Sequence, residues 1–464
     1  MRMPPLGSAL VCLLAAPAVA QAALPPATTA AMDKAAAAIL ARTAAPSASM
    51  AVVKDGKVAY LKAYGTAVLA TKTPATPGMC YSIGSISKQF TAAAILLLAE
   101  EGKLSLDDPL ARWFPELTRA KDITVRQILS MTSGYQDYWP QDYVMPGVLK
   151  PVTAQAILDG WARKPLDFEP GTKWQYSNTN YVIAGQIVEK VSGQPLLAFL
   201  KARIFKPLGM ASVVDSDDAP LGPGEPMRYL RYALGPARPA PKEGKGWMFA
   251  AGELAMTAQD LARWDEAMIA RKILTPASWQ TLETEVRLAD GAGTQYGLGV
   301  SVALKDGRRV ISHSGEVSGF TAENVVYPDQ GVAVVVLTNL DATSASGDLA
   351  AKAAQAVFAD ADPGTPAALA QARAVFAGLQ KGRLDRSLFS ANANAYFTPQ
   401  ALRDFADSLG PLGTPTSFTQ ASQGLRGGMV VRRYKVVFPK KAVRVWTYAL
   451  PDGKLEQYMA AAAE

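Results

Sequence analysis

The sequence predicts an α+β fold, in which one antiparallel sheet is built from both ends of the main domain. Helices flank this sheet, a large helical insert separates its two halves, and a small α+β domain follows at the C-terminus. Hairpin patterns at residues 49–66 and again after residue 297 are the first observation behind this prediction. Helical patterns between about residues 86 and 285 are the second. Strands from both ends can share one sheet while the intervening helices cover it.

Residues 1–22 have the features of a secretory signal peptide. Arg2 supplies a positive end, residues 6–16 are apolar, and alanines at 18 and 20 or at 20 and 22 would form a cleavage site. The apolar stretch is too short to cross a membrane, and no later stretch is long and apolar enough to be a transmembrane segment. We therefore expect a periplasmic or secreted protein.

Residues 30–358 form the main predicted domain, and tight turns mark its strands. The Asp-Gly pair at 55–56 lies between two strand-like runs, which is the pattern of a hairpin with a two-residue turn. A second Asp-Gly pair at 306–307 and a Pro-Asp-Gln-Gly turn at 328–331 separate further runs of this kind. Both ends of the domain therefore supply hairpins.

Helix signals fill the middle of this domain. Residues 91–99 are apolar on nearly every side, as in a helix inside a domain, and Gly102 follows as a C-cap. Cap patterns open two later helices, at Thr257 and at Thr275. These helices form the predicted insert.

A linker and a small domain follow the main domain. Residues 359–366 read Ala-Asp-Ala-Asp-Pro-Gly-Thr-Pro, a composition typical of linkers. Residues 367–464 contain two helical segments and about four strand-like runs, which predicts a small α+β domain. No recognisable set of catalytic residues lies in it, so its function stays open.

Composition argues against several classes of protein. The chain has 464 residues, of which 49% are hydrophobic and 19% charged, as in globular rather than disordered proteins. Its net charge of +7 is not gathered into a basic cluster with aromatic residues, so we expect no nucleic-acid partner. Cys80 is the one cysteine after residue 22, which leaves no internal disulfide. His313 is the only histidine, and a zinc hydrolase needs several His or Cys ligands, so we expect no metal and no cofactor.

Ser85 and Lys88 are the strongest chemical signal in the chain. They form Ser-x-x-Lys at the start of the buried helical segment, and residues three apart share a helix face. A serine becomes a good nucleophile when a base takes its proton, and a lysine kept away from water can be that base. The spacing therefore predicts an activated serine.

Two further motifs follow in order, Tyr176-Ser177-Asn178 and His313-Ser314-Gly315. Together the three motifs resemble those of the serine penicillin-recognising enzymes, over roughly residues 30–358. The resemblance is strongest to the branch with class C β-lactamases, D-alanyl-D-alanine carboxypeptidases, D-aminopeptidases and family VIII carboxylesterases. This resemblance implies the same fold that the turns and helices predict.

The resemblance also implies an acyl-enzyme mechanism. Ser85 would attack a carbonyl, and Lys88 would take or orient its proton. Tyr176 would act as general base or proton shuttle, with a pKa lowered by Lys88 and by a partly charged His313. Asn178 would hydrogen-bond the substrate amide or Lys88.

Residues around the third motif would complete the site. The oxyanion would lie between the backbone N–H of Ser85 and that of Glu316, which follows Gly315. His313 stands where β-lactamases usually have the lysine of Lys-Thr-Gly, and an ordinary histidine pKa of roughly 6.5 would leave it mostly uncharged near neutral pH. We therefore expect weaker binding of anionic penicillins.

Three functions are compatible with these motifs. The leading interpretation is a secreted serine acyl hydrolase that cleaves a peptide, amide or ester, of D-amino-acid peptidase or carboxylesterase type. The alternatives are a class C-like β-lactamase and a non-catalytic penicillin- or muropeptide-binding protein. The substrate would be a small molecule or short peptide, including one derived from the cell wall. The sequence leaves open the acceptor, water or an amine, and the oligomeric state.

Overall fold

The computed structural model describes residues 23–141, 143–217, 221, 225–360 and 365–463. The predicted signal peptide, residues 1–22, lies outside the described residues, as does the centre of the predicted linker at 361–364. Within the described ranges, no helix is long and apolar enough to cross a membrane.

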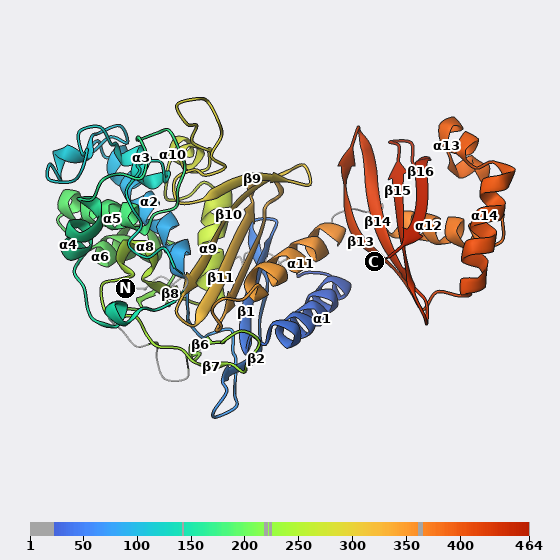
Figure 1. Ribbon diagram of the computed structural model, residues 1–464, viewed down its shortest axis with the longest axis horizontal. Helices are drawn as coiled ribbons and strands as arrows, with labels where there is room; N and C mark the ends of the chain where they lie inside the picture. The colour runs from blue at the N-terminus through green and yellow to red at the C-terminus, as the bar shows by residue number, and fades with distance from the viewer. Residues whose placement is uncertain (1–22, 142, 218–220, 222–224, 361–364, 464) are drawn as a thin grey trace, which may run out of the picture.

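A seven-stranded antiparallel sheet forms the centre of the main domain (Figure 1). The sheet joins segments from both ends of this domain, because β1 (Ser47–Lys54) pairs with β12 (Val332–Thr338). β1 also pairs with β2 (Lys57–Val68) through the predicted hairpin, and both residues of its Asp-Gly turn have positive φ. The prediction of one antiparallel sheet built from both ends is therefore confirmed. The order is β3-β2-β1-β12-β11-β10-β9, with β3 at Thr73–Pro74, β11 at Phe320–Tyr327, β10 at Arg308–Val317 and β9 at Ser301–Lys305.

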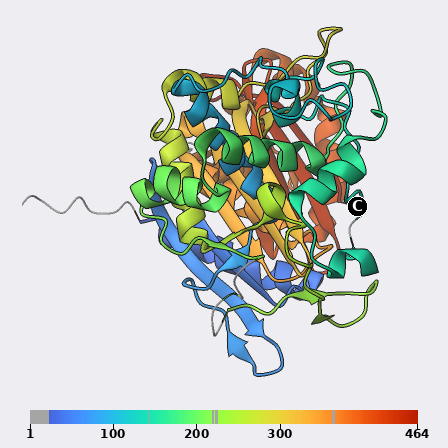
Figure 2. The same cartoon turned by 90° about the vertical axis from the view of Figure 1, so that its left-hand side faces the viewer.

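Helices cover both faces of this sheet (Figures 1 and 2). On one face, α1 (Pro26–Thr43) and α11 (Ala345–Asp360) enclose a core to which Val334 and Val336 of β12 contribute. On the other face, α9 (Ala258–Ile269) packs on β1 and β12 in a larger core that also takes up most of the helical insert. Every residue of β12 is buried, because successive side chains of a strand point to opposite faces and both faces here are covered.

The helical insert provides the elements that hold the site. The buried helix α2 (Ser87–Glu100) contacts α5 (Asn178–Ser192), and both contact α8 (Phe249–Gly252). The predicted caps at Thr257 and Thr275 accept backbone N–H hydrogen bonds at the starts of α9 and α10. The other helices are α3 (Val125–Leu129), α4 (Ala154–Ile157), α6 (Leu196–Leu200), α7 (Lys206–Leu208) and α10 (Pro276–Leu282). Short strands are β4 (Tyr81–Ser82), β5 (Val214–Asp215), β6 (Tyr229–Leu230), β7 (Arg238–Pro239) and β8 (Leu254–Met256).

The C-terminal segment has a sheet and a hydrophobic core of its own. Its four strands are antiparallel in the order β13-β14-β15-β16. They pack with α12 (Thr365–Leu379), α13 (Ala391–Tyr396) and α14 (Pro399–Leu409) around a separate cluster of buried side chains. The strands are β13 (Ser417–Arg426), β14 (Met429–Val437), β15 (Ala442–Ala449) and β16 (Leu455–Ala462).

Candidate active site

Ser85 lies in a tight turn that leads directly into α2. The turn is a 3₁₀ segment, Gly84–Ile86, and its first residue has a φ of 52°, a conformation that glycine adopts without strain. Lys88 lies in the first turn of α2, where the spacing of three residues places it beside Ser85. The Lys88 ammonium donates a hydrogen bond of 2.9 Å to Ser85 Oγ. The structure thus brings these two residues together as the sequence predicted.

Lys88 is fully buried and surrounded by oxygen atoms. Besides Ser85 Oγ, its Nζ donates to Asn178 Oδ1 and to the carbonyl oxygen of Ala251, each at 2.8 Å. Burial lowers the pKa of Lys88 from 10.5 to about 7, although the Asp137 carboxylate acts in the opposite direction. A large share of Lys88 is therefore neutral near pH 7 and able to accept a proton.

Asp137 is a site residue that the sequence did not identify. It lies in the loop at 135–141, and its carboxylate accepts the backbone N–H of Asn178 at 3.0 Å and the Asn178 side-chain amide at 3.3 Å. Asn178 in turn presents its carbonyl oxygen to Lys88. Burial raises the pKa of Asp137, while its N–H donors and Lys88 lower it. No spacing rule links Asp137 to Asn178, 41 residues later, so only the folded chain reveals the pair.

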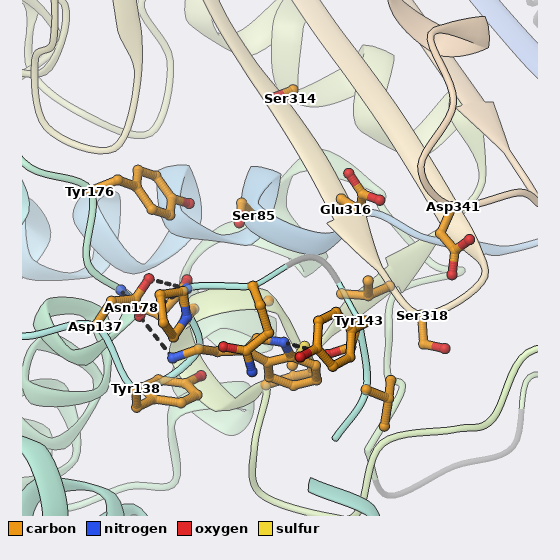
Figure 3. A pocket seen from close by; sticks show the side chains of 18 of the residues that line it. Ser85, Asp137, Tyr138, Tyr143, Tyr176, Asn178, Ser314, Glu316, Ser318 and Asp341 are labelled. Atoms are coloured by element: carbon orange, nitrogen blue, oxygen red, sulfur yellow. Dashed lines mark hydrogen bonds between the residues drawn. The ribbon is translucent and has the colours of Figure 1, made fainter. Parts of the chain in front are cut away.

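Tyr176 points its hydroxyl toward Ser85 (Figure 3). Its hydroxyl oxygen is buried and has no hydrogen-bond partner among the described residues, although Ser85 is close enough to act against the rise in its pKa. Lys88 Nζ lies 5.0 Å from the centre of the Tyr176 ring. The expected lowering of the Tyr176 pKa is wrong: burial raises it well above 10, because the phenolate would lose its hydration. Tyr176 is therefore a neutral phenol that can donate a proton.

His313 lies on β10 and forms two hydrogen bonds through its ring. Nδ1 is 2.6 Å from the carbonyl oxygen of Ser314, and Nε2 is 2.9 Å from the hydroxyl of Tyr296. A carbonyl can only accept, so Nδ1 carries the hydrogen and Nε2 accepts from Tyr296. Burial and the nearby Lys88 lower the pKa of His313 to about 4. The expected partial charge on His313 near neutral pH is therefore wrong.

Gly315 and Glu316 bring β10 against the turn that carries Ser85. A Cβ atom on Gly315 would lie 1.9 Å from the Ile83 carbonyl oxygen and 3.3 Å from the Ser85 nitrogen. A Cβ atom on Gly84 would lie 2.7 Å from the Glu316 nitrogen. The amides of Ser85 and Glu316 thus border the same close contact between β10 and the turn.

A pocket of about 720 Å³ opens over these residues. One wall is the aromatic segment at 136–141 with Tyr143, and another is the end of β10. The residues that line the pocket include the motif residues Ser85, Tyr176, Asn178 and His313, and also Asp137, Ser314, Glu316, Ser318 and Asp341. The three sequence motifs therefore meet at one cavity.

A separate group of carboxylates lies outside this pocket. Asp215, Asp217 and Glu253 have carboxylate oxygens within 4.8 Å of one another and line a different cavity, together with Lys245. None of the three lines the pocket around Ser85. The absence of a metal from the reaction stays a prediction from the sequence.

The sequence profile of the beta-lactamase family matches residues 32–358, well over half of the chain. The chain belongs to this family. It is a hydrolase of the serine beta-lactamase and penicillin-binding protein group, with the α+β fold of that group.

Three known proteins are similar to this member of the family. Penicillin-binding protein 4* of Bacillus subtilis (strain 168) is 28% identical over 67% of this chain and 72% of its own length. A D-aminopeptidase of Brucella anthropi is 29% identical over 63% of this chain and 56% of its own length, so this chain spans just over half of that enzyme. The crystal structure of a D-stereospecific amidohydrolase from Streptomyces sp. is 28% identical with a TM-score of 0.61, covering 70% of this chain and 97% of the other.

Proposed function

We propose that this hydrolase acts through an acyl-enzyme on Ser85 and cleaves D-amino-acid amides, short D-peptides or esters. The observation that carries the proposal is the hydrogen bond between Ser85 Oγ and a fully buried Lys88 whose pKa is lowered to about 7. Such a lysine can be neutral and accept the serine proton at physiological pH. The names of two similar proteins, a D-aminopeptidase and a D-stereospecific amidohydrolase, support the substrate class.

In the first step, Ser85 Oγ forms a bond to the substrate carbonyl carbon and gives its proton to neutral Lys88. The carbonyl oxygen becomes negative and faces the amides of Ser85 and Glu316, which stabilise it as hydrogen-bond donors. The bond from the carbonyl carbon to the leaving nitrogen or oxygen then breaks, and that atom takes the Tyr176 proton. Lys88 returns its proton to Tyr176, which leaves an ester on Ser85.

Hydrolysis of the ester uses neutral Lys88 as the base once more. A water molecule gives a proton to neutral Lys88 while its oxygen bonds to the acyl carbon. Ser85 Oγ then leaves and takes the proton back from Lys88, so the enzyme returns to its starting state. Asn178 and Asp137 hold Lys88 in place throughout, through the hydrogen bonds described above.

The two alternatives from the sequence receive less support. A β-lactamase would gain from a permanent cation in the third motif, but His313 is buried and neutral. A non-catalytic binding protein would not need a lysine with a lowered pKa beside a serine. The secreted or periplasmic location is part of the proposal and depends on residues 1–22.

A fluorophosphonate probe and a substrate panel test this function. The probe should add one adduct to wild type, on the peptide that contains Ser85, and none to Ser85→Ala. The panel contains D-alanine amide, 4-nitrophenyl acetate, benzylpenicillin and a chromogenic cephalosporin. Faster turnover of the two β-lactams than of the amide and the ester would favour the β-lactamase. Labelling that persists in Ser85→Ala would remove Ser85 as the nucleophile.

A further inference from the structure

A cavity of about 630 Å³ lies between the main domain and the C-terminal segment. The main domain contributes α1, the turn between β9 and β10, the end of β11 and α11, and the C-terminal segment contributes β13 and β14. Figure 1 shows α11 extending from the seven-stranded sheet toward β13 and β14. None of the residues described as lining this cavity also lines the pocket around Ser85. Its size and its place between two segments with separate cores are typical of small-molecule sites.

Aromatic and alanine side chains form the apolar part of the cavity wall. The rings of Tyr327, at the end of β11, and Phe358, in the last turn of α11, meet edge to face with 4.8 Å between their centres. Short side chains surround these rings and leave space above them. They are alanines of α1 and α11, at positions 31, 35, 351, 354, 356 and 359. The wall can therefore contact the apolar body of a ligand.

Cationic side chains outnumber carboxylates by four to one among the described residues that line this cavity. Lys305 and Arg308 are direct partners in the β9–β10 hairpin, so their side chains project from the same face of it. Lys435 comes from β14 on the other side of the cavity, and Lys352 from α11. The carboxylate is that of Asp306. The cavity therefore carries an excess of positive charge.

Three of these cations are not neutralised within the described part of the chain. No described residue forms an ion pair or a side-chain hydrogen bond with Lys305, Arg308 or Lys435. The Arg308 guanidinium instead lies 4.2 Å from the centre of the Phe358 ring, beside the apolar wall. Lys305 acts on the Glu323 carboxyl, but burial raises the pKa of that carboxyl to about 7, so it does not hold a full charge. A bound anion would gain these cations as partners without breaking an ion pair.

β13 closes the cavity from the C-terminal side. A Cβ atom on Gly424 would lie 3.6 Å from Asp306 Oδ1, so β13 and the β9–β10 turn are in contact. Thr419 of β13 lines the cavity directly opposite Lys435 on β14. The apolar wall and the cations thus belong to one enclosed space that both segments build.

We propose that this cavity binds a small molecule that combines an anionic group, such as a carboxylate, sulfonate or phosphate, with an apolar body. The anion would lie among Lys305, Arg308 and Lys435, and the apolar body would contact the paired rings of the wall. A neutral molecule of the same shape would lose the charge pairing and bind more weakly. This inference is independent of the proposed function, because the cavity shares no described residue with the pocket around Ser85.

Two fluorescent probes of similar shape test this site on the whole chain. One is 1-anilinonaphthalene-8-sulfonate, which is anionic, and the other is N-phenyl-1-naphthylamine, which lacks the sulfonate and is neutral. Fluorescence titration gives a Kd for each probe, and the quantity to compare is the ratio of the neutral Kd to the anionic Kd. Wild type should bind the anionic probe more tightly, and decanoate, a carboxylate with an apolar chain, should displace it.

Arg308→Gln and Lys435→Gln remove one charge from each side of the cavity. Each should weaken binding of the anionic probe about fivefold, the scale of one partly exposed charge pair, and the double variant by about tenfold or more. The Kd of the neutral probe should change much less. Lys34→Gln/Lys381→Gln is the matched control, because it removes one exposed cation from α1 and one from the turn after α12, and neither lines the cavity. It should leave the ratio unchanged.

Four results would overturn the proposal. They are equal Kd values for the two probes in wild type, an unchanged ratio in the double variant, an equal fall in the control pair, and a wild type that binds neither the anionic probe nor decanoate. Circular dichroism establishes that each variant folds. Lys305→Gln/Lys435→Gln repeats the test without disturbing the contact between Arg308 and Phe358, so it decides the result if the first double variant does not fold.

Two sources could supply such an anion, and a further measurement separates them. Sedimentation with phosphatidylglycerol vesicles that the double variant loses would assign the anionic group to a membrane lipid. Displacement of the probe by decanoate, with no sedimentation, would assign it to a free ligand. Either result supports a site for an anion with an apolar body.

Discussion

Lys88 has no exposed surface, and its amine is surrounded by Ser85 Oγ, Asn178 Oδ1 and the Ala251 carbonyl. Burial penalises the charged form of Lys88 and of the titratable side chains near it. The pKa of Lys88 therefore falls to about 7 and that of His313 to about 4, whereas the pKa of Tyr176 rises. At the scale of single residues, one physical cause therefore gives Lys88, His313 and Tyr176 the protonation states that the proposed mechanism needs.

Between pH 5 and 9, the pH dependence of activity should reflect the titration of Lys88 alone. kcat/KM for a neutral ester should rise with pH to a plateau with a midpoint near 7, because only neutral Lys88 can take the Ser85 proton. Lys88→Met should lose at least about a thousandfold in kcat/KM, as when a nucleophile loses its base. A midpoint near 6.5 that disappears in His313→Gln would instead show that His313 titrates.

The stability of the protein should also depend on the protonation of Lys88. Its pKa is about 7 in the folded chain and near its ordinary 10.5 in the unfolded chain, so between these pH values the unfolded chain binds the extra proton. The titration of Lys88 should therefore make the free energy of unfolding rise as the pH increases from about 7 to about 10.5. Thermal melts should show this rise in wild type and Ser85→Ala, and a smaller rise in Lys88→Met. The same dependence of stability on pH in all three proteins would contradict the lowered pKa of Lys88.

At the scale of elements, the site depends on the contact between β10 and the turn at Gly84–Ile86. Gly315 allows this contact, because any side chain there would meet the Ile83 carbonyl oxygen. The contact sets the positions of the Ser85 and Glu316 amides, and α2 and α5 supply Lys88 and Asn178 beside them. Four segments distant in the sequence thus position the groups that the proposed mechanism uses.

Gly315→Ala should separate β10 from this turn and move the Glu316 amide. A shift of about 1 Å in such a site typically costs on the order of a hundredfold in rate, so we expect a loss of that size in kcat/KM. Gly347→Ala is the control, because a Cβ there would meet only Glu323 Oε2, at 3.8 Å. Wild-type activity in a folded Gly315→Ala variant would show that the contact does not set the geometry.

At the scale of the whole molecule, the segment after residue 364 is built around its own core. No residue described beyond 364 lines the pocket around Ser85. The predicted boundaries at 30–358, 359–366 and 367–464 stay predictions, and the family profile itself ends at residue 358.

A chain that ends at Asp360, the last residue of α11, should keep the active site. It should fold and react with a fluorophosphonate at Ser85 at a rate close to that of the full chain, because the pocket is complete without later residues. Circular dichroism would establish folding, and mass spectrometry the adduct. A folded truncated chain that no longer reacts would show that the C-terminal segment completes the site.

Removal of metal ions should leave hydrolysis unchanged. In the proposed mechanism Lys88 is the base and Tyr176 the proton donor, and the carboxylates of Asp215, Asp217 and Glu253 line a different cavity. Activity on a neutral ester should be the same before and after exhaustive dialysis against EDTA. Loss of activity that zinc restores, with no loss of fold, would contradict the mechanism.

The sequence by itself determined the features that depend on short spacings and local conformation. The Asp-Gly pair at 55–56 formed its hairpin turn, Thr257 and Thr275 capped their helices, and Ser85 and Lys88 met across one helical turn. Residues close in the sequence determine these turns, caps and contacts, and the local geometry of such features varies little between proteins. The ordered motifs likewise placed Tyr176, Asn178 and His313 at one pocket.

Only the tertiary structure decided the charges at the site and the partners that come from distant segments. Nothing in the sequence pairs Asp137 with Asn178, or Glu316 with the loop after β12, because these contacts depend on how separate elements pack. It also led to a wrong expectation for Tyr176 and His313, since a pKa depends on the water excluded by the whole fold rather than on adjacent residues. Local spacing therefore defined which groups the proposed mechanism uses, while packing set their protonation.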